Sequence, residues 1–351
     1  MLLTQETFEM TFLATPFVIM ALAGVTLMLL LLRFWNAALI MALLTLLVNG
    51  CTEQIPLHLT NQFPAEKPAG TLRVLEYNIC GKVEYAPVHG APFIEYVKNL
   101  NADLLFLPEN TIGTAHGLER MLRETYPYSL HDFPGFEELS VVYADLSIYS
   151  RYPLSNFRSY HLDMEKIKRD HPYLPKEDVE FVGNYMIVYE ATADIDGTPV
   201  TLVHVHLRTN SYDSAKSNGN GKRQKVHNIY ENMQFGYAYR GEESRSIADS
   251  LRNCPNPLIV CGDFNDVSGA KCIRTIQNCR AKNVHEGHRD RLSDAWWRGG
   301  QGFGFTFAAQ KLRLRLDHIL YSKEFDLQGV CVDTVSFSDH RPLIADFKFN
   351  P

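Results

Sequence analysis

The sequence predicts a layered α/β fold, built as one large domain that extends from about residue 71 to the C-terminus. Short apolar and β-branched runs typical of buried strands recur along this region, and stretches typical of helices lie between them. No long gap, repeat or low-complexity tract divides it. Several of the strands end in a polar side chain, and open α/β sheets place their sites at such ends.

Composition is that of a folded protein, because 46% of the 351 residues are apolar and the charges are interspersed. The net charge of −6 weakens the case for a dedicated nucleic-acid binder, which is usually basic, but leaves room for a nuclease with a local basic patch. The seven cysteines include no C-x-x-C pair, so we expect no structural zinc site. Their spacing does not choose disulfide partners.

Residues 1–50 are predicted to be a hydrophobic membrane segment. The stretch 11–32 contains 22 residues without a charge, and 34–48 is a second, shorter apolar run. In one interpretation the two runs form a helical hairpin with Arg33 on the cytoplasmic side, which leaves both ends of the hairpin outside. Residues 51–70 follow as a polar linker with three prolines, and 71–351 as the catalytic domain.

A second interpretation of the N-terminus stays open. If translation starts at Met28, Arg33 and the second apolar run form a signal peptide that ends in a loose lipoprotein box at Cys51. In both interpretations the remaining chain is exported and stays tethered to a membrane, as an inner-membrane protein or as a lipoprotein.

Within the domain we expect mixed strands and helices in alternation. The expected strands are 72–79, 103–107, 139–149, 185–189, 200–207, 258–261, 312–321 and 343–349. The expected helices are 92–100, 118–125, 241–251 and 270–278. The polar stretch 209–243 is expected to be a loop over the site. Its charges at Lys216, Lys222, Arg223 and Lys225 are either a solvated surface or a means to hold an anionic substrate.

The run 257–266 carries the first candidate site residues. An apolar strand is broken by Gly262, and Asp263 and Asn265 follow. Residues two apart in an extended chain point to the same side, so both side chains would emerge together at the end of the strand. Taken alone, the pattern could also be an Asx-rich turn.

Other predicted strands deliver polar groups in the same way, and each alone has an ordinary explanation as a turn, a cap or a solvated edge. These groups are Asn78, Glu109, His206, Asp317 and the neighbours Asp339 and His340. The alternation in 311–317 would put Arg313, Arg315 and Asp317 on one face of a strand.

Together these residues suit metal-assisted phosphoester hydrolysis. Mg²⁺ prefers oxygen ligands and keeps several waters, so one or two carboxylates suffice, and Glu109 fits with Asn78 and Asp339 beside it. In-line attack on phosphorus also needs a group that activates water and positive charge on the phosphoryl oxygens. A histidine held by a carboxylate can serve there, which suits His340 with Asp317.

The motifs and their order resemble the endonuclease/exonuclease/phosphatase superfamily, which includes deoxyribonuclease I, abasic-site endonucleases, neutral sphingomyelinases and inositol-polyphosphate 5-phosphatases. The resemblance covers roughly 72–349. It rests on Asn78, Glu109, 150–153, His206–Leu207, 262–265, Leu316–Asp317 and 338–340. It implies a four-layer α/β sandwich of two packed mixed sheets flanked by helices, with the site at one end of the sheets.

The resemblance also implies a role for each site residue. Glu109 would bind Mg²⁺, or Mn²⁺, with help from Asn78, and Asp339 would lie near the metal. Asp263 would activate or orient the attacking water, steadied by Asn265, and His206 would contact the phosphoryl oxygens. His340, oriented by Asp317, would be a base or a phosphate ligand, and the choice of base between Asp263 and His340 stays open. The segment 302–307 together with Arg315, a candidate substrate ligand, resembles bacterial membrane-attached members.

The predicted function is therefore Mg²⁺-dependent hydrolysis of a phosphoester by a monomeric, membrane-tethered enzyme outside the cytoplasm. Nucleic acid, phospholipid headgroups and small phosphoesters all stay open as substrates. One alternative is a catalytically silent binding module on the same fold, which retention of Glu109, Asp263 and His340 disfavours. Another is a transporter or sensor subunit, which the lack of charges other than Arg33 within the apolar segments disfavours.

Overall fold

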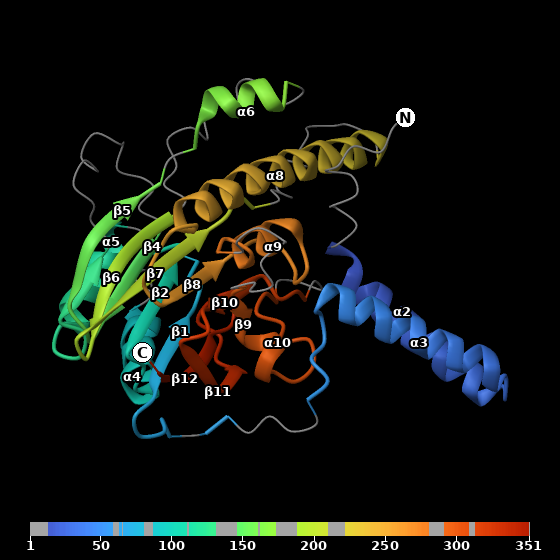
Figure 1. Cartoon of the computed structure of the whole chain (residues 1–351), viewed down its shortest axis with the longest axis horizontal. Helices are drawn as coiled ribbons and strands as arrows, with labels where there is room; N and C mark the ends of the chain where they lie inside the picture. Colours follow the sequence, from blue (N-terminus) through green and yellow to red (C-terminus); the bar gives the residue numbers. More distant parts are fainter. Residues whose placement is uncertain are drawn as a thin grey trace.

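Two six-stranded mixed sheets lie at the centre of the protein in this computed structural model (Figure 1). The structure describes residues 13–58, 63–64, 66–80, 87–110, 112–130, 146–160, 162–172, 188–209, 222–280, 291–308 and 313–350. Apolar side chains from both sheets, among them Phe106 of one and Leu202 and Ile319 of the other, form the largest hydrophobic cluster. The sheets therefore pack face to face, and the expected α/β sandwich is confirmed.

The first sheet has the strand order β11-β12-β1-β2-β4-β3. Only β1 and β2 are parallel, and the other neighbours are antiparallel. Its strands are β1 (Leu72–Glu76), β2 (Leu104–Pro108), β3 (Tyr128–Leu130), β4 (Leu146–Ser150), β11 (Phe325–Val332) and β12 (Leu343–Phe349).

The second sheet has the strand order β5-β6-β7-β8-β10-β9. Here β7 and β8 are parallel, with His206 opposite Asp263, while β10 runs antiparallel to β8 and places Asp317 opposite the same Asp263. This register brings three of the expected site residues to one end of the sheet. The strands are β5 (Leu154–Ser159), β6 (Val188–Ile195), β7 (Thr198–His206), β8 (Leu258–Asp263), β9 (Ser293–Asp294) and β10 (Asp317–Tyr321).

Helices cover the outer faces of both sheets. Phe93 and Val97 of α4 (Pro87–Leu100) and Leu118 and Leu122 of α5 (Ile112–Leu122) pack on the first sheet. The C-terminal part of α8 (Lys222–Leu251) and α9 (Lys271–Gln277) pack on the second. The shorter helices are α6 (Met164–Asp170) and α10 (Ala295–Gly299), and each begins with an aspartate that caps a backbone N–H.

An antiparallel pair of apolar helices, α2 (Thr15–Leu31) and α3 (Trp35–Thr52), extends away from the sheets (Figure 1). Most of its large apolar side chains, such as Leu39 and Leu47, are exposed. By length and composition α3 could cross a membrane, and α2 is one residue shorter. We call this pair the hairpin.

Most expected elements are present, with shifted bounds. The predicted strand 139–149 corresponds to β4, and its part before residue 146 lies outside the described residues. The strand expected at 185–189 is β6, which is described from Val188, and the strand expected at 312–321 begins only at Asp317. The predictions did not include β3, β5, β9, β11, α6 and α10.

The expected loop at 209–243 is wrong over most of its length, because 222–251 form the 30-residue helix α8. The helix was not predicted because its sequence is mostly polar. Tyr239, Arg240 and Glu243 are almost fully buried, so polar residues occupy positions that apolar ones usually fill. Lys216 lies outside the described residues, as do the side chains of Lys222, Arg223 and Lys225.

Gly262 marks the point where β8 passes close to β7. Its φ is +147°, and a Cβ at this position would overlap the carbonyl oxygen of Val205. Only glycine lets the two backbones approach this closely just before Asp263.

We therefore predict that Gly262→Ala lowers the free energy of unfolding by about 3 kcal/mol or more, because backbone must move to make room. Gly197→Ala is the matched control, since Gly197 also has a positive φ (+85°) but nothing lies within 4 Å of the added methyl group. It should cost about 1 kcal/mol. Urea unfolding of both variants measures the difference, and equal losses would contradict the close approach.

Candidate active site

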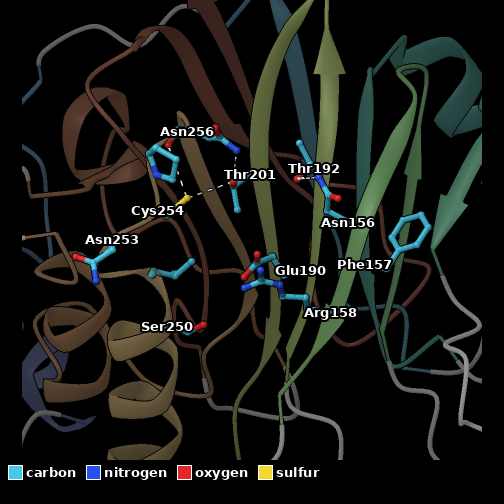
Figure 2. Close-up of a pocket in the computed structure, with 12 residues that line it drawn as sticks. Asn156, Phe157, Arg158, Glu190, Thr192, Thr201, Ser250, Asn253, Cys254 and Asn256 are labelled. Atoms are coloured by element: carbon cyan, nitrogen blue, oxygen red, sulfur yellow. Dashed lines mark hydrogen bonds between the residues drawn. The ribbon is translucent and has the colours of Figure 1, made fainter.

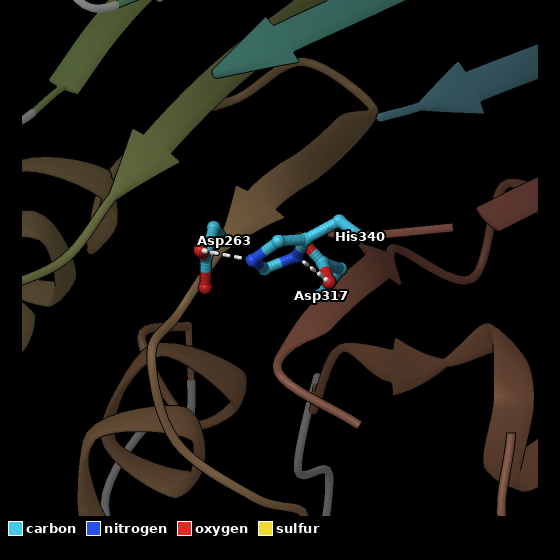
Figure 3. Close-up of side chains that lie close together, drawn as sticks. All are labelled: Asp263, Asp317 and His340. Carbon is cyan, nitrogen blue, oxygen red and sulfur yellow. Dashed lines mark hydrogen bonds and ion pairs between the residues drawn. The ribbon is translucent and has the colours of Figure 1, made fainter. Parts of the chain in front are cut away.

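The centre of the site is formed by Asp263, Asp317 and His340, which lie together although they come from three separate parts of the chain (Figure 3). His340 Nδ1 lies 2.8 Å from Asp317 Oδ2, and its Nε2 lies 3.7 Å from Asp263 Oδ2. All three are at most 6% exposed. The imidazole thus stands between two carboxylates.

Local structure fixes each member of this triad. Asp263 ends β8 and Asp317 begins β10, so the antiparallel pairing puts them side by side. The hydroxyl of Thr306 accepts hydrogen bonds from the backbone N–H groups of Leu316 and Asp317 at 3.1 and 3.2 Å. The ring of Phe307 packs edge-on against His340, with 5.0 Å between the ring centroids.

The surrounding charges and burial give Asp263 and His340 clearly different pKa values. Burial and then the nearby Asp317 carboxylate raise the pKa of Asp263 to about 6, while His340 and His206 pull it down. Burial alone would lower the pKa of His340, but the charge and hydrogen bond of Asp317 outweigh it and raise this pKa to about 9. At neutral pH the site therefore holds an ionised Asp263 and a protonated His340.

Asn78 and Glu109 come from the first sheet, just beyond the ends of the parallel strands β1 and β2. The Asn78 side-chain amide donates to Glu109 Oε1 at 3.0 Å and lies 3.1 Å from Asp263 Oδ2. Glu109 has a positive φ of 54°, which turns the chain as it leaves β2. Asn78 is thus the residue that links the Glu109 carboxylate to the triad across the two sheets.

His206 and Asn265 complete the contacts around Asp263. His206 Nε2 lies 4.0 Å from Asp263 Oδ2. The backbone N–H of Asn265 donates to Asp263 Oδ1 at 2.7 Å, and its side-chain amide donates to the carbonyl of Leu207 at 2.8 Å. Both residues therefore adjoin Asp263, His206 through its ring and Asn265 through its backbone N–H.

The described contacts of Asp339 and Arg315 differ from those of His206 and Asn265, which are centred on Asp263. Asp339 precedes His340 and accepts a hydrogen bond from the Ser338 hydroxyl at 3.2 Å. Arg315 is 4% exposed, and its guanidinium contacts Asp294 at 3.0 Å and also contacts His318 and Ser268. The described contacts of Arg315 are thus with supporting residues rather than with the triad. Arg315 precedes β10, which begins at Asp317, and the face that it was expected to share with Asp317 stays a prediction.

Glu76 was missed by sequence reasoning. It is fully buried at the end of β1, and burial, followed by Asp317 and Asp263, raises its pKa well above the usual range. Neither carboxyl oxygen of Glu76, nor Asp317 Oδ1, has a hydrogen-bond donor among the described residues. A proton on Glu76 lets it donate to Asp317, which satisfies both groups. The i, i+2 spacing of Glu76 and Asn78 was the signal that could have found it.

Helix α8 also contributes residues that the loop prediction missed. The guanidinium of Arg240 lies 3.4 Å from Asp266 and donates to the carbonyl of Arg208 at 2.7 Å. Glu243 accepts from the backbone N–H of Arg208 at 2.8 Å. Arg208 and Asp266 follow His206 and Asp263 by two and three residues, so α8 braces the two chain segments that leave β7 and β8.

The donor set fits a divalent cation. Carboxylate oxygens of Asp263 and Asp317 lie within 4.8 Å of each other and of a ring nitrogen of His340, which can bind a cation only when the imidazole is neutral. Glu109 adds another carboxylate, which the Asn78 side-chain amide links to Asp263. Carboxylate and amide oxygens are what Mg²⁺ and Mn²⁺ accept, and a cation would offset this excess of negative charge.

A separate pocket of about 480 Å³ lies at the other end of the second sheet (Figure 2). Thr201 near the start of β7 lines it, with Glu190 and Arg158 of the neighbouring strands β6 and β5 and Ser250 near the end of α8. It contains none of the expected site residues, and its charged side chains, Arg158 and Glu190, have opposite signs.

Comparison with known proteins agrees with this geometry. The model of the endonuclease/exonuclease/phosphatase family matches residues 75–340. An endonuclease/exonuclease/phosphatase from Beutenbergia cavernae DSM 12333 is 17% identical, with 80% of this chain and 72% of that chain covered and a TM-score of 0.51. A humanized TDP2 of D. rerio is 14% identical, with coverages of 80% and 99% and a TM-score of 0.51. No curated protein matches the chain. At such identities the solved structures show the fold alone.

The raised pKa of Glu76 predicts a pH dependence of stability. The folded state keeps a proton that the unfolded chain releases above pH 4.5, so stability falls as pH rises above that value. Glu76→Gln keeps the shape and a donor for Asp317 but removes the titration. We expect its melting temperature to exceed that of the wild type at pH 8, with a smaller difference at pH 5.

The matched control is Glu165→Gln, because the Glu165 side chain is 83% exposed. It should follow the wild-type curve at both pH values. A constant offset between Glu76→Gln and the wild type from pH 5 to pH 8 would contradict a proton on Glu76.

Proposed function

Because the chain belongs to the endonuclease/exonuclease/phosphatase family, whose members are metal-dependent phosphoester hydrolases, we propose that it hydrolyses a phosphoester at the Asp263–Asp317–His340 site. The observation that carries the proposal is the triad itself, with Asn78 and Glu109 beside it. The proposed metal is Mg²⁺, with Mn²⁺ as an alternative, and the proposed holders are Glu109 and Asn78, with Asp339 nearby. When bound, it would polarise the phosphoryl group and neutralise its charge.

In this proposal Asp263 is the base. Its pKa of about 6 leaves it ionised at neutral pH, and the Asn78 amide and the Asn265 backbone N–H hold its two oxygens in place. It orients a water molecule for in-line attack on phosphorus and accepts its proton.

His340 then supplies positive charge. Its pKa of about 9 keeps the imidazole protonated, and the hydrogen bond to Asp317 fixes the ring so that Nε2 faces Asp263, 3.7 Å from its Oδ2. His206, on the other side of Asp263, is proposed as a second contact for the phosphoryl oxygens. Because Asp263 is ionised and His340 is protonated at neutral pH, Asp263 can accept a proton and His340 cannot, so we assign Asp263 as the base.

We further propose the division into a hydrophobic anchor at 1–50, a linker at 51–70 and a catalytic domain at 71–351 that works as a monomer outside the cytoplasm. The apolar exposed surface of the hairpin supports membrane attachment. Arg33 lies in the turn between α2 and α3. With Arg33 inside, both ends of the hairpin emerge on the outer side.

The first test is hydrolysis of a chromogenic phosphodiester by the full chain, stripped of metal and assayed with and without millimolar Mg²⁺. We expect turnover only with metal, and a fall in kcat of about 10²–10⁴-fold in Asp263→Asn and in His340→Ala. Asp326→Asn and His58→Ala change exposed residues and should keep wild-type rates. No turnover on DNA, RNA, sphingomyelin or inositol phosphates with several metals would point instead to a binding module.

The two pKa values predict a bell-shaped pH profile. The rate should rise as Asp263 loses its proton, at or below pH 6, and fall as His340 loses its proton, at or below pH 9, because a bound cation favours the deprotonated form of each group. A profile of log kcat/KM against pH at saturating Mg²⁺ measures both limbs. If His340 were the base instead, activity would keep rising through pH 9.

A further inference from the structure

The base of the hairpin is attached to the loop that follows Asp263. The side-chain amide of Gln54, just after α3, donates to the carbonyl of Ser268 at 2.5 Å, and Gln54 is only 5% exposed. A Cβ on Gly269 would lie 2.6 Å from the carbonyl oxygen of Thr52, the last residue of α3. The end of the helix and the loop 266–269 are therefore in direct backbone contact.

Three arginines of the domain hold the same segment. Arg315 donates to the backbone carbonyl of Glu53 at 3.3 Å, and Arg291 pairs with its carboxylate at 3.0 Å. Arg274 donates to the carbonyl of Cys51. Arg315 is itself buried in an ion pair with Asp294, so this contact belongs to the interior of the domain.

The start of the hairpin is attached next to the triad as well. Leu13 packs against the cluster of Val267, Leu314 and Leu316, and so does Phe307. Phe307 is the residue whose ring contacts His340. One end of the hairpin thus packs on the cluster that includes Leu316, the neighbour of Asp317, and the other end contacts the loop 266–269 that follows Asp263.

These contacts limit the distance between the site and the hairpin. Ser268 is five residues after Asp263, so even a fully extended chain puts them at most about 18 Å apart. Helix α3 is continuous from Trp35 to Thr52, and the side chain of Asn49 exchanges two hydrogen bonds with the backbone of Ile55. No flexible segment separates the apolar part of the hairpin from the docked residues 51–54.

We propose that the docked base of the hairpin holds the active site at the surface of the bilayer that contains the hairpin, so that the enzyme selects phosphoesters by their location. Its substrate is then a phosphoester on a membrane-embedded molecule rather than a freely diffusing one. The inference rests on the proposed function, and it treats Gln54 and Arg315 as positioning residues. A passive tether would need neither of them.

The test compares one reacting group in two forms, a soluble nitrophenyl phosphodiester and the same ester joined to a dialkylglycerol in phosphatidylcholine vesicles. The full chain is reconstituted in these vesicles. One variant combines six Gly and Ser residues inserted after Val48 with Leu13→Ser, which together release both ends of the hairpin while 49–54 stay docked. The matched control carries Leu13→Ser and the same insertion after Leu57, an exposed residue beyond the docked segment.

We expect the Val48 insertion to lower kcat/KM on the vesicle-borne ester by about tenfold, because the site is no longer held at the surface. Its rate on the soluble ester should stay within about twofold of wild type. The Leu57 insertion should change neither rate.

An unchanged ratio between the two esters would overturn the proposal and leave the hairpin as a passive tether. A parallel loss on both esters in the Val48 variant would also overturn it, because the hairpin would then support the site itself rather than its location. If the wild type hydrolysed neither ester while the broader substrate screen succeeded, the preference for membrane-borne phosphodiesters would fail. If that screen failed as well, the proposed function would fail with it.

Discussion

The mutual proximity of three buried carboxyl groups, Glu76, Asp263 and Asp317, is the constraint on which the site depends. Placing negative charges together away from water is costly unless each is paired or protonated. Three features of the structure offset this cost. The His340 imidazolium lies between Asp263 and Asp317, amide groups donate hydrogen bonds to Asp263, and the raised pKa of Glu76 keeps that group protonated. The remaining imbalance is what makes the site suited to a cation. Strand register, the Thr306 hydroxyl and the packing of Phe307 all serve to hold these groups in place.

Much of this site could be predicted because the signals were local. An apolar strand that ends in a polar residue directs that side chain to one sheet end, as with Asp263 at the end of β8. The same rule applied to β1 would have added Glu76 to Asn78. The order of strands and helices likewise gave the α/β class, since apolar strands are recognisable without knowing their neighbours. What these signals share is that each depends on a few consecutive residues.

The parts that sequence reasoning did not give depend on partners far away in the chain. Helix α8 has a polar sequence, and Arg240 can be buried there only because Asp266 and the Arg208 carbonyl receive it. Arg315 was expected at the substrate, but Asp294 lies close enough to pair with it in the interior. The docking of Gln54 on Ser268 joins residues 214 positions apart. No pattern of composition or spacing encodes such pairings, because either partner alone is equally compatible with a solvated surface.

The pairing of β1 with β12 gives the protein a built-in order of maturation. Leu72 lies opposite Phe347, so the first strand of the sandwich finds one of its neighbours only when the last strand has been made. His340 lies just ahead of that last strand, whereas Asn78, Glu109 and Asp263 are all synthesised earlier. A chain still emerging from the ribosome therefore carries the acidic groups without the imidazole that neutralises them. The groups of the site can therefore come together only after β12 has been made.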